Sequence, residues 1–278
     1  MGTGRARRGV DRISDLPDEL LESILLRLPC TADAVRTSVL SRRWRRVWAH
    51  VPALSFRQGD QAPGASILNG VDASLAAHAA PTLDRLSVST IVEDRTSQLW
   101  HEGLAARVAQ WLRFASRRQV AELSLSLLRH RSPRVCIPIV ELELPVCQRA
   151  TTIDVSLVHV AMKLRLPEAG TFAALRVLRI DCVYLEMSDL ERAVSSQCPR
   201  LQEIALTELV RARKVDLSIR SELLQRLKLG CRISIGGQIT VQAPRLLRLE
   251  MPRYMGPKGC HIAAPSLAEM TWHNSLHP

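Results

Sequence analysis

Apolar residues recur along most of the chain in the pattern L-x-x-L-x-L, with other apolar residues at some of the Leu positions. The last five triplets begin at residues 175, 201, 224, 246 and 267, which gives steps of 26, 23, 22 and 21 residues. These steps lie within the period of about 20–29 residues that is typical of leucine-rich repeats. The eight triplets are Leu83, Leu86 and Val88; Val120, Leu123 and Leu125; Ala150, Ile153 and Val155; Leu175, Leu178 and Ile180; Leu201, Ile204 and Leu206; Leu224, Leu227 and Leu229; Leu246, Leu249 and Met251; and Leu267, Met270 and Trp272.

The spacing inside each triplet predicts a short strand. Its last two apolar residues are two positions apart, so both side chains point to the same face of a strand and into a shared core. One repeat cannot bury that face alone, but stacked repeats can. An ordinary α/β domain with Leu-rich strands is the alternative, and the even spacing of five triplets favours the solenoid.

The segments between the triplets carry their own patterns. The first interval is long and contains an amphipathic helix, with one apolar side formed by Trp100, Leu104, Val108, Trp111 and Leu112. Residues 187–196 have helical spacing, whereas residues 215–219 alternate like a strand. We therefore expect return segments of mixed type.

The region before the repeats has a helical pattern broken by helix-ending residues. A helix start at residues 14–19 precedes apolar positions at helical spacing, and Pro29 ends that helix. A second helix begins at Thr31 or Asp33 and a third at Ser41 or Arg42, before Pro52. So small a helical unit buries little surface, and we expect it to need a partner or a neighbouring domain.

These patterns predict an α/β chain in which a three-helix unit precedes a repeat solenoid. We expect a flexible basic tail at residues 1–9 and the helical unit at residues 10–57. Residues 58–80 read as a linker with a short helix around residues 71–79, and residues 81–278 hold about eight irregular repeats. No capping repeat is evident after Trp272.

Composition is that of an ordinary globular protein, with 46% hydrophobic and 23% charged residues in 278. No apolar run approaches the roughly 18 residues that a membrane span needs, and the first residues lack the apolar stretch of a secretory signal. The seven cysteines are widely spaced and form no CxxC pair, so we expect buried core thiols in a reducing, intracellular compartment, either nucleus or cytoplasm.

The net charge of +11 raises the question of nucleic-acid binding. The basic residues comprise 34 Arg and only 4 Lys, and the aromatic fraction is 4%. A nucleic-acid surface usually interleaves basic and aromatic side chains. A compositional Arg bias therefore explains the charge better than a nucleic-acid surface.

Catalytic, cofactor and metal sites are not indicated. Cys260 and His261 are adjacent, but catalytic partners are set by fold geometry and not by adjacency. Residues 256–259 lack the spacing and the Ser or Thr of a phosphate-binding loop. His273 and His277 have no third metal ligand nearby.

Several segments resemble a known family. Residues 11–25 and 37–48, with Leu-Ser-Arg-Arg-Trp at 40–44, look like an F-box. Residues 51–56, 108–125 and 198–206 are similar to plant F-box proteins that carry leucine-rich repeats. The resemblance implies a non-catalytic substrate receptor of a cullin-type ubiquitin ligase, whose F-box docks on a Skp-family adaptor and whose repeats bind an unknown target protein. The alternatives are a basic solenoid that binds nucleic acid and a scaffold without a ligase role.

Matching to the F-box pattern suggests an apolar adaptor-binding face, although some of its members could instead pack the unit's own core. The matched residues are Leu16, Pro17, Leu20, Ile24, Leu25, Leu28, Val39, Leu40, Trp44 and Trp48. Trp44 is favoured as an anchor because Trp is enriched at binding hot spots. The arginines at positions 42, 43, 45 and 46 either contact acidic groups of the adaptor or form a solvated helix face.

The residues between the core positions of each strand are expected to face the outer, concave side and to contact the target. They are Glu122, Asp154, Arg179, Asp181, Glu203, Arg226, Lys228, Arg248 and Glu250, with Ser124, Ser156 and Thr207 beside them. Acidic residues come earlier and basic residues later, which suits a polar target of complementary charge. Exposed strand positions are polar in any soluble solenoid, however, so the pattern alone does not identify a site.

Overall fold

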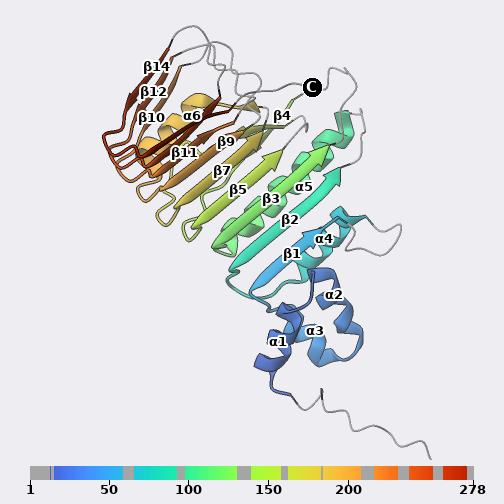
Figure 1. Cartoon of the computed structure of the whole chain (residues 1–278). Coiled ribbons are helices and arrows are strands. Elements are labelled where there is room, and N and C mark those ends of the chain that lie inside the picture. Colours follow the sequence, from blue (N-terminus) through green and yellow to red (C-terminus); the bar gives the residue numbers. More distant parts are fainter. Residues whose placement is uncertain are drawn as a thin grey trace, which may run out of the picture.

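The structure is a computed structural model of the whole chain, and it describes residues 13, 16–58, 66–92, 98–129, 139–157, 162–182, 184–207, 216–230, 238–252 and 259–273. Short helices form the N-terminal part, and a stack of parallel strands forms the rest (Figure 1). The predicted flexible tail at residues 1–9 lies outside the described residues. The N-terminal elements are α1 (Asp18–Leu26), α2 (Thr31–Arg36), the 3₁₀ turn η1 (Thr37–Val39) and α3 (Arg42–Trp48).

In the described part of the chain, nine parallel strands form the main sheet, which runs through the molecule in the order β1-β2-β3-β5-β7-β9-β11-β13-β15. Its strands are β1 (Ala53–Arg57), β2 (Arg85–Val92), β3 (Glu122–Arg129), β5 (Thr152–Leu157), β7 (Val177–Cys182), β9 (Glu203–Thr207), β11 (Arg226–Leu229), β13 (Arg248–Pro252) and β15 (Glu269–His273). Sequential strands are neighbours throughout, as stacking of repeats requires.

The core lies on one side of the main sheet. The first seven of the eight predicted triplets are buried along their whole length, and in-register pairs such as Leu123 with Ile153 stack one repeat on the next. This confirms the predicted leucine-rich-repeat solenoid behind a helical N-terminal unit. In an ordinary doubly wound α/β domain, by contrast, the order of the strands across the sheet differs from their order in the chain.

The return segments cover the core from the other side (Figure 1). They include α5 (Gln98–Arg117) and α6 (Met187–Arg192) with the π turn η2 (Ala193–Gln197), which match the predicted helices. The others form two small parallel sheets, β4 (Val140–Glu143), β6 (Met162–Arg165) and β8 (Tyr184–Leu185), and β10 (Leu217–Arg220), β12 (Ile239–Gln242) and β14 (Cys260–Ala263). Across the described ranges, every helix is too short or too polar to cross a membrane.

The first strand of the main sheet comes from the F-box-like region, which the triplet pattern did not identify. Val51, Leu54 and Phe56 have the same spacing as a triplet and are all buried. Strand β1 pairs with β2 from Ala53 opposite Arg85 to Arg57 opposite Ser89. The helical unit is thus joined directly to the solenoid through a shared sheet.

The segment that the sequence marks as a linker contains α4 (Ile67–Ala77) and packs against this junction. The buried His78 follows α4, and its Nε2 lies 3.0 Å from the carbonyl oxygen of Val51. Ala79 N–H donates to the Ala49 carbonyl at 2.7 Å. These contacts fix the chain that leads from α4 into the first repeat.

The last triplet is different, because its core side is open. Met270 and Trp272 are 38% and 47% exposed, although their in-register neighbours Leu249 and Met251 are fully buried. The final described strand therefore presents core positions to its surroundings.

Candidate functional site

Four of the predicted adaptor-binding residues form exposed apolar surface on the helical unit. Leu20 and Ile24 lie one turn apart on α1 and are 50% and 40% exposed. Val39 and Leu40, at the end of η1, are 83% and 66% exposed. Apolar side chains this exposed on so small a unit mark a surface that a partner can cover.

Other members of the predicted face lie in the core of the unit. Leu25, Trp44 and Trp48 are almost fully buried, while Leu16 and Leu28 are half-buried against that core. The expectation that Trp44 anchors a partner is corrected, because α3 turns its Trp44, Val47 and Trp48 side inward.

The exposed set also includes residues that were not predicted. Leu26 at the end of α1 is 46% exposed, and Ile13 before it is 54% exposed. Only Leu21 and Leu25 of α1 are buried. Since the helix carries apolar residues on more than one side, its sequence alone does not tell which side is free. Pro17 is exposed and precedes the first turn of α1.

Among the arginines of α3, Arg43 has a role within the unit. Its Nε donates to Asp18 Oδ1 at 2.6 Å, and its Nη2 donates to the Leu16 carbonyl. This clamps the start of α1 onto α3. Arg42, Arg45 and Arg46 are exposed.

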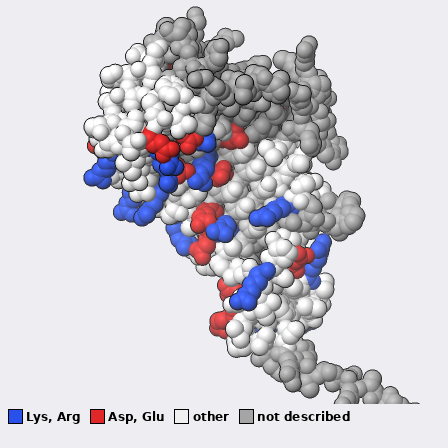
Figure 2. Space-filling view, in the orientation of Figure 1, with Lys and Arg blue, Asp and Glu red and all other residues white. Residues whose placement is uncertain are grey.

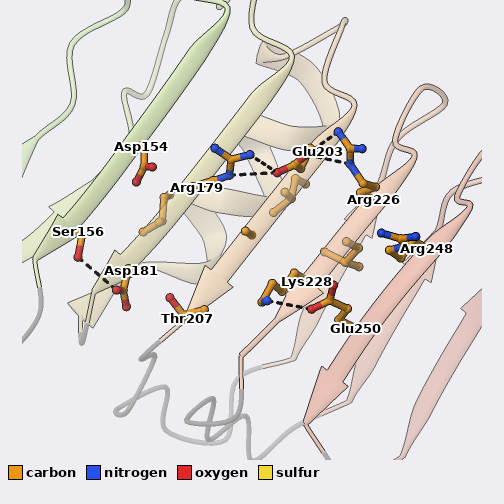
Figure 3. A pocket seen from close by; sticks show the side chains of 14 residues that line it. Asp154, Ser156, Arg179, Asp181, Glu203, Thr207, Arg226, Lys228, Arg248 and Glu250 are labelled. Carbon is orange, nitrogen blue, oxygen red and sulfur yellow. Dashed lines mark hydrogen bonds and ion pairs between the residues drawn. The ribbon is translucent and has the colours of Figure 1, made fainter. Parts of the chain in front are cut away.

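The second candidate surface is the face of the main sheet that carries no helices, which we call the open face. Charged side chains gather over the middle and later strands of this face (Figure 2). Between β5 and β13 it is hollowed into a pocket of about 450 Å³. Eight of the nine predicted charged residues, all except Glu122, line this pocket with Ser156 and Thr207, whereas Ser124 is not part of its lining (Figure 3). Glu122 lies outside it and pairs with Arg85 at 2.7 Å.

The floor of the pocket depends on a residue that the sequence did not single out. In the strand register, Ala205 of β9 lies between Arg179 of β7 and Lys228 of β11. Two long side chains therefore flank a methyl group, and the hollow occupies the space that a larger residue would fill. An Ala inside a strand whose neighbours are charged is the signal that could have located it.

Charges inside the pocket largely pair with one another. Arg179 and Arg226 both donate to Glu203, at 2.7 Å and 2.8 Å, and Lys228 lies 2.9 Å from Glu250 (Figure 3). Burial raises the pKa of Glu203, but the hydrogen bonds and charges of the two guanidinium groups outweigh it, so the pKa lies below its ordinary value. These cross-strand pairs hold the pocket walls in place.

Two carboxylates at the β5–β7 side of the pocket differ from the rest. Over the described residues, Asp154 makes no hydrogen bond or ion pair, and burial raises its pKa, with a counteracting charge from Arg179 and a further raising charge from Asp181. Asp181 Oδ2 accepts from Ser156 at 3.2 Å, whereas its Oδ1 is buried without a partner among those residues. The carboxylate oxygens that accept no hydrogen bond from a described residue therefore lie together at this side of the pocket.

Metal-ligating side chains and thiols can be placed in the described ranges. No group of three or more metal-ligating side chains occurs there. Cys147 and Cys198 are buried free thiols, and burial raises their pKa to about 11 and about 12. Thiols of this kind are unreactive core residues, as expected for Cys198. Cys182 has no described side chain, and His277 lies outside the described residues.

Comparison with known proteins matches both parts of the chain. The F-box domain matches residues 13–55. A family described as "FBD-associated F-box protein At5g56370, LRR repeats" matches residues 108–271.

Similar proteins come from Arabidopsis thaliana. The F-box/FBD/LRR-repeat protein At2g04230 is 30% identical over 263 residues, covering 91% of this chain and 55% of the relative. The F-box/LRR-repeat protein At1g55660 is 32% identical over 240 residues, which cover 79% and 58% of the two chains. The putative F-box/LRR-repeat protein At4g15060 is 28% identical over 258 residues, which cover 89% and 56%. The chain thus spans about half the length of the curated relatives it matches.

Proposed function

This chain belongs to the family of F-box proteins with leucine-rich repeats, and from that premise we propose that it is the substrate-recognition subunit of a cullin-type E3 ubiquitin ligase. Its F-box docks on a Skp-family adaptor and its open face binds the protein to be ubiquitinated. The family names point to an adaptor or receptor and not to a catalyst. The chain then contributes proximity and orientation, while other subunits perform the transfer.

The adaptor contact rests on the exposed apolar residues of the helical unit. Leu20, Ile24, Val39 and Leu40 are the large apolar residues of the predicted face that remain exposed, and Pro17 is exposed beside them in the chain. Covering such side chains removes apolar surface from water, at about 25 cal/mol per Å². Leu25, Trp44 and Trp48 support the contact indirectly, because they hold α1 and α3 together from within.

The single observation that carries the target contact is the pocket on the open face. Eight of the nine predicted target-binding residues line one hollow, and its walls are fixed by cross-strand ion pairs. A rigid, polar hollow loses little entropy when it binds, which favours a specific protein segment. The free carboxylate oxygens of Asp154 and Asp181 favour hydrogen-bond donors on that segment.

Co-purification with a Skp-family adaptor tests the first contact. We expect Ile24→Asp with Leu40→Asp to weaken adaptor binding by roughly tenfold or more, because charges replace exposed anchors. The matched control is Leu247→Asp, since Leu247 is 47% exposed on the solenoid and far from α1 in sequence. Unchanged adaptor binding in the double variant would refute the assigned surface.

Affinity purification followed by reconstituted ubiquitination tests the target contact. Ala205→Trp fills the pocket floor, so it should retain the adaptor but lose a target that wild type and Leu247→Asp both capture. That target should be ubiquitinated by the ligase assembled on wild type and not by the ligase assembled on Ala205→Trp. A target captured and modified equally with both chains would refute the pocket as its binding site.

A further inference from the structure

A second groove lies on the opposite side of the main sheet, between α4 and α5. These two helices contact each other on the side away from the open face (Figure 1). The groove has a volume of about 570 Å³, which is within the range of small-ligand and peptide pockets. Neither the F-box nor the open face uses it.

The rim of the groove carries unbalanced positive charge. Arg113 and Arg117 are exposed, lie one turn apart on α5, and form no ion pair or hydrogen bond with any side chain that the structure describes. Like charges at this spacing repel each other. Arg118, next in the chain, is held in place by donating to the His78 carbonyl at 2.9 Å.

Among the residues that the structure describes, Asp72 is the one acidic residue that lines the groove, and it is already engaged. Asp72 Oδ1 accepts from Trp111 Nε1 at 2.7 Å, and its Oδ2 lies 3.3 Å from Arg107. The adjacent His78 adds no positive charge near neutral pH, because burial lowers its pKa. The three rim arginines therefore lack a carboxylate within the described part of the fold.

The floor of the groove is apolar. Leu75 and Ala76 line it from α4, and Phe114 lines it from α5, with the Arg118 guanidinium 5.5 Å from the centre of its ring. A ligand must therefore present anionic groups to the rim and an apolar group to the floor. Of the two aromatic residues that line the groove, Trp111 is buried, which leaves Phe114 as one partly exposed ring. One ring cannot stack successive bases, so a nucleic acid fits less well.

We propose that the groove between α4 and α5 binds an acidic, amphipathic segment of a partner protein. Carboxylates of that segment pair with Arg113, Arg117 and Arg118, and an apolar side chain packs on Phe114 and Leu75. Arginine suits this role because its planar fork matches a carboxylate. The proposal is independent of the proposed ligase function, since it uses neither the F-box surface nor the open face.

The test measures fluorescence anisotropy of a labelled synthetic peptide of alternating Glu and Leu, titrated with the full chain. A peptide of alternating Lys and Leu, a Glu-only peptide and a single-stranded oligothymidine of equal length serve as comparison probes. We expect the Glu-Leu peptide to bind best. Failure of that peptide to bind, or tighter binding of oligothymidine, would overturn the proposal.

Two sets of variants locate the binding. Arg113→Glu with Arg117→Glu should weaken the Glu-Leu peptide by roughly tenfold or more, whereas Arg200→Glu with Arg245→Glu changes the net charge equally on distant exposed turns and should leave binding unaltered.

Ala76→Glu places a carboxylate in the groove and should also weaken the peptide, while Ala77→Glu adds the same charge at the next exposed position of α4, which does not line the groove. Because both alanines are exposed, folding is retained in this pair. Equal effects of Ala76→Glu and Ala77→Glu would overturn the groove as the site.

Discussion

At the scale of single residues, the carboxylates of the open face divide into two kinds with opposite effects on stability. Glu203 is held by Arg179 and Arg226, and its pKa lies below the ordinary value. Asp154 is partly buried without a hydrogen-bond or ion-pair partner among the described residues, and its pKa lies above the ordinary value. Paired carboxylates maintain the pocket, whereas the unpaired one is available to a ligand.

Replacing Glu203 by Gln should destabilise the fold by about 1 kcal/mol at pH 7, because both arginine partners are half-exposed and solvent screens them. Because folding lowers the pKa of Glu203, its ionised carboxylate stabilises the fold at pH values above its pKa in the unfolded state. This stabilisation is lost as the pH falls through its pKa in the folded state. The difference from wild type in urea denaturation should therefore shrink below about pH 4.

Glu269→Gln is the control for that substitution. Glu269 pairs with Arg248 at 2.7 Å, but both side chains are 52% exposed, so its loss should cost less than about 0.5 kcal/mol. Equal losses in the two variants would contradict the special role of Glu203.

Replacing Asp154 by Asn should have the opposite effect on stability. Because folding raises the pKa of Asp154, ionisation of its carboxyl destabilises the folded state at pH values above that folded-state pKa. The melting temperature of the variant should therefore be about 1–2 °C higher than that of wild type at pH 7. At pH 3, where the Asp154 carboxyl of wild type is protonated, the two melting temperatures should be the same. Differential scanning calorimetry at both pH values measures this, and a lower melting temperature at pH 7 would contradict it. Under the proposed function, the same variant binds the target more weakly.

At the scale of elements, the solenoid is tightly packed within its stack, and its core positions become exposed at β15. Leu206 on β9 is completely buried, so Leu206→Ala should cost about 2–5 kcal/mol. Trp272 occupies the equivalent side of β15 but is half-exposed, so Trp272→Ala should cost about 1 kcal/mol or less despite the larger side chain removed. Urea denaturation followed by circular dichroism compares the two. A larger loss at Trp272 would mean that the last strand is as well packed as the middle of the stack.

The elements also show what a sequence can and cannot predict. Triplets such as Leu201, Ile204 and Leu206 predicted their strands because a two-residue alternation determines which face is buried. Strand β1 was missed because Val51, Leu54 and Phe56 follow a helical segment and lie outside the regular spacing.

The candidate surfaces were less predictable for a similar reason. Leu20 and Leu25 are both apolar, so the choice of exposed face on α1 depends on where α3 packs. The pocket floor at Ala205 required the register of three strands, which no local pattern contains.

At the scale of the whole molecule, the net charge of +11 does not make the open face basic. Arginines on that face pair with acids in neighbouring strands, as Arg85 does with Glu122 and Arg248 with Glu269. Arginines without a side-chain partner among the described residues lie instead on α5, at Arg113 and Arg117, and on the exposed side of α3. Charge is thus distributed by surface, and the open face presents paired charges more than net positive charge.

The shared sheet makes the F-box and the repeats one mechanical unit. Thr31 of α2 accepts from the Ser55 amide of β1 at 2.7 Å, and β1 continues into the repeat stack. Under the proposed function, this arrangement holds the target at a fixed distance from the adaptor. Positioning of this kind is what raises the effective concentration of a target beside the transfer machinery.

Leu54→Ala tests this coupling. Leu54 is fully buried in β1 between the two parts, and its truncation should cost about 2–5 kcal/mol. If the parts unfold together, hydrogen exchange followed by mass spectrometry should show protection falling by similar factors in α3 and in β2. The control is Val241→Ala, at an equally buried position on β12 in the small sheet behind the stack. This variant should lower hydrogen-exchange protection more in β12 and β14 than in α3. Loss of protection in α3 alone after Leu54→Ala would mean that the F-box opens independently, and the fixed geometry between adaptor and target would no longer follow from the shared sheet.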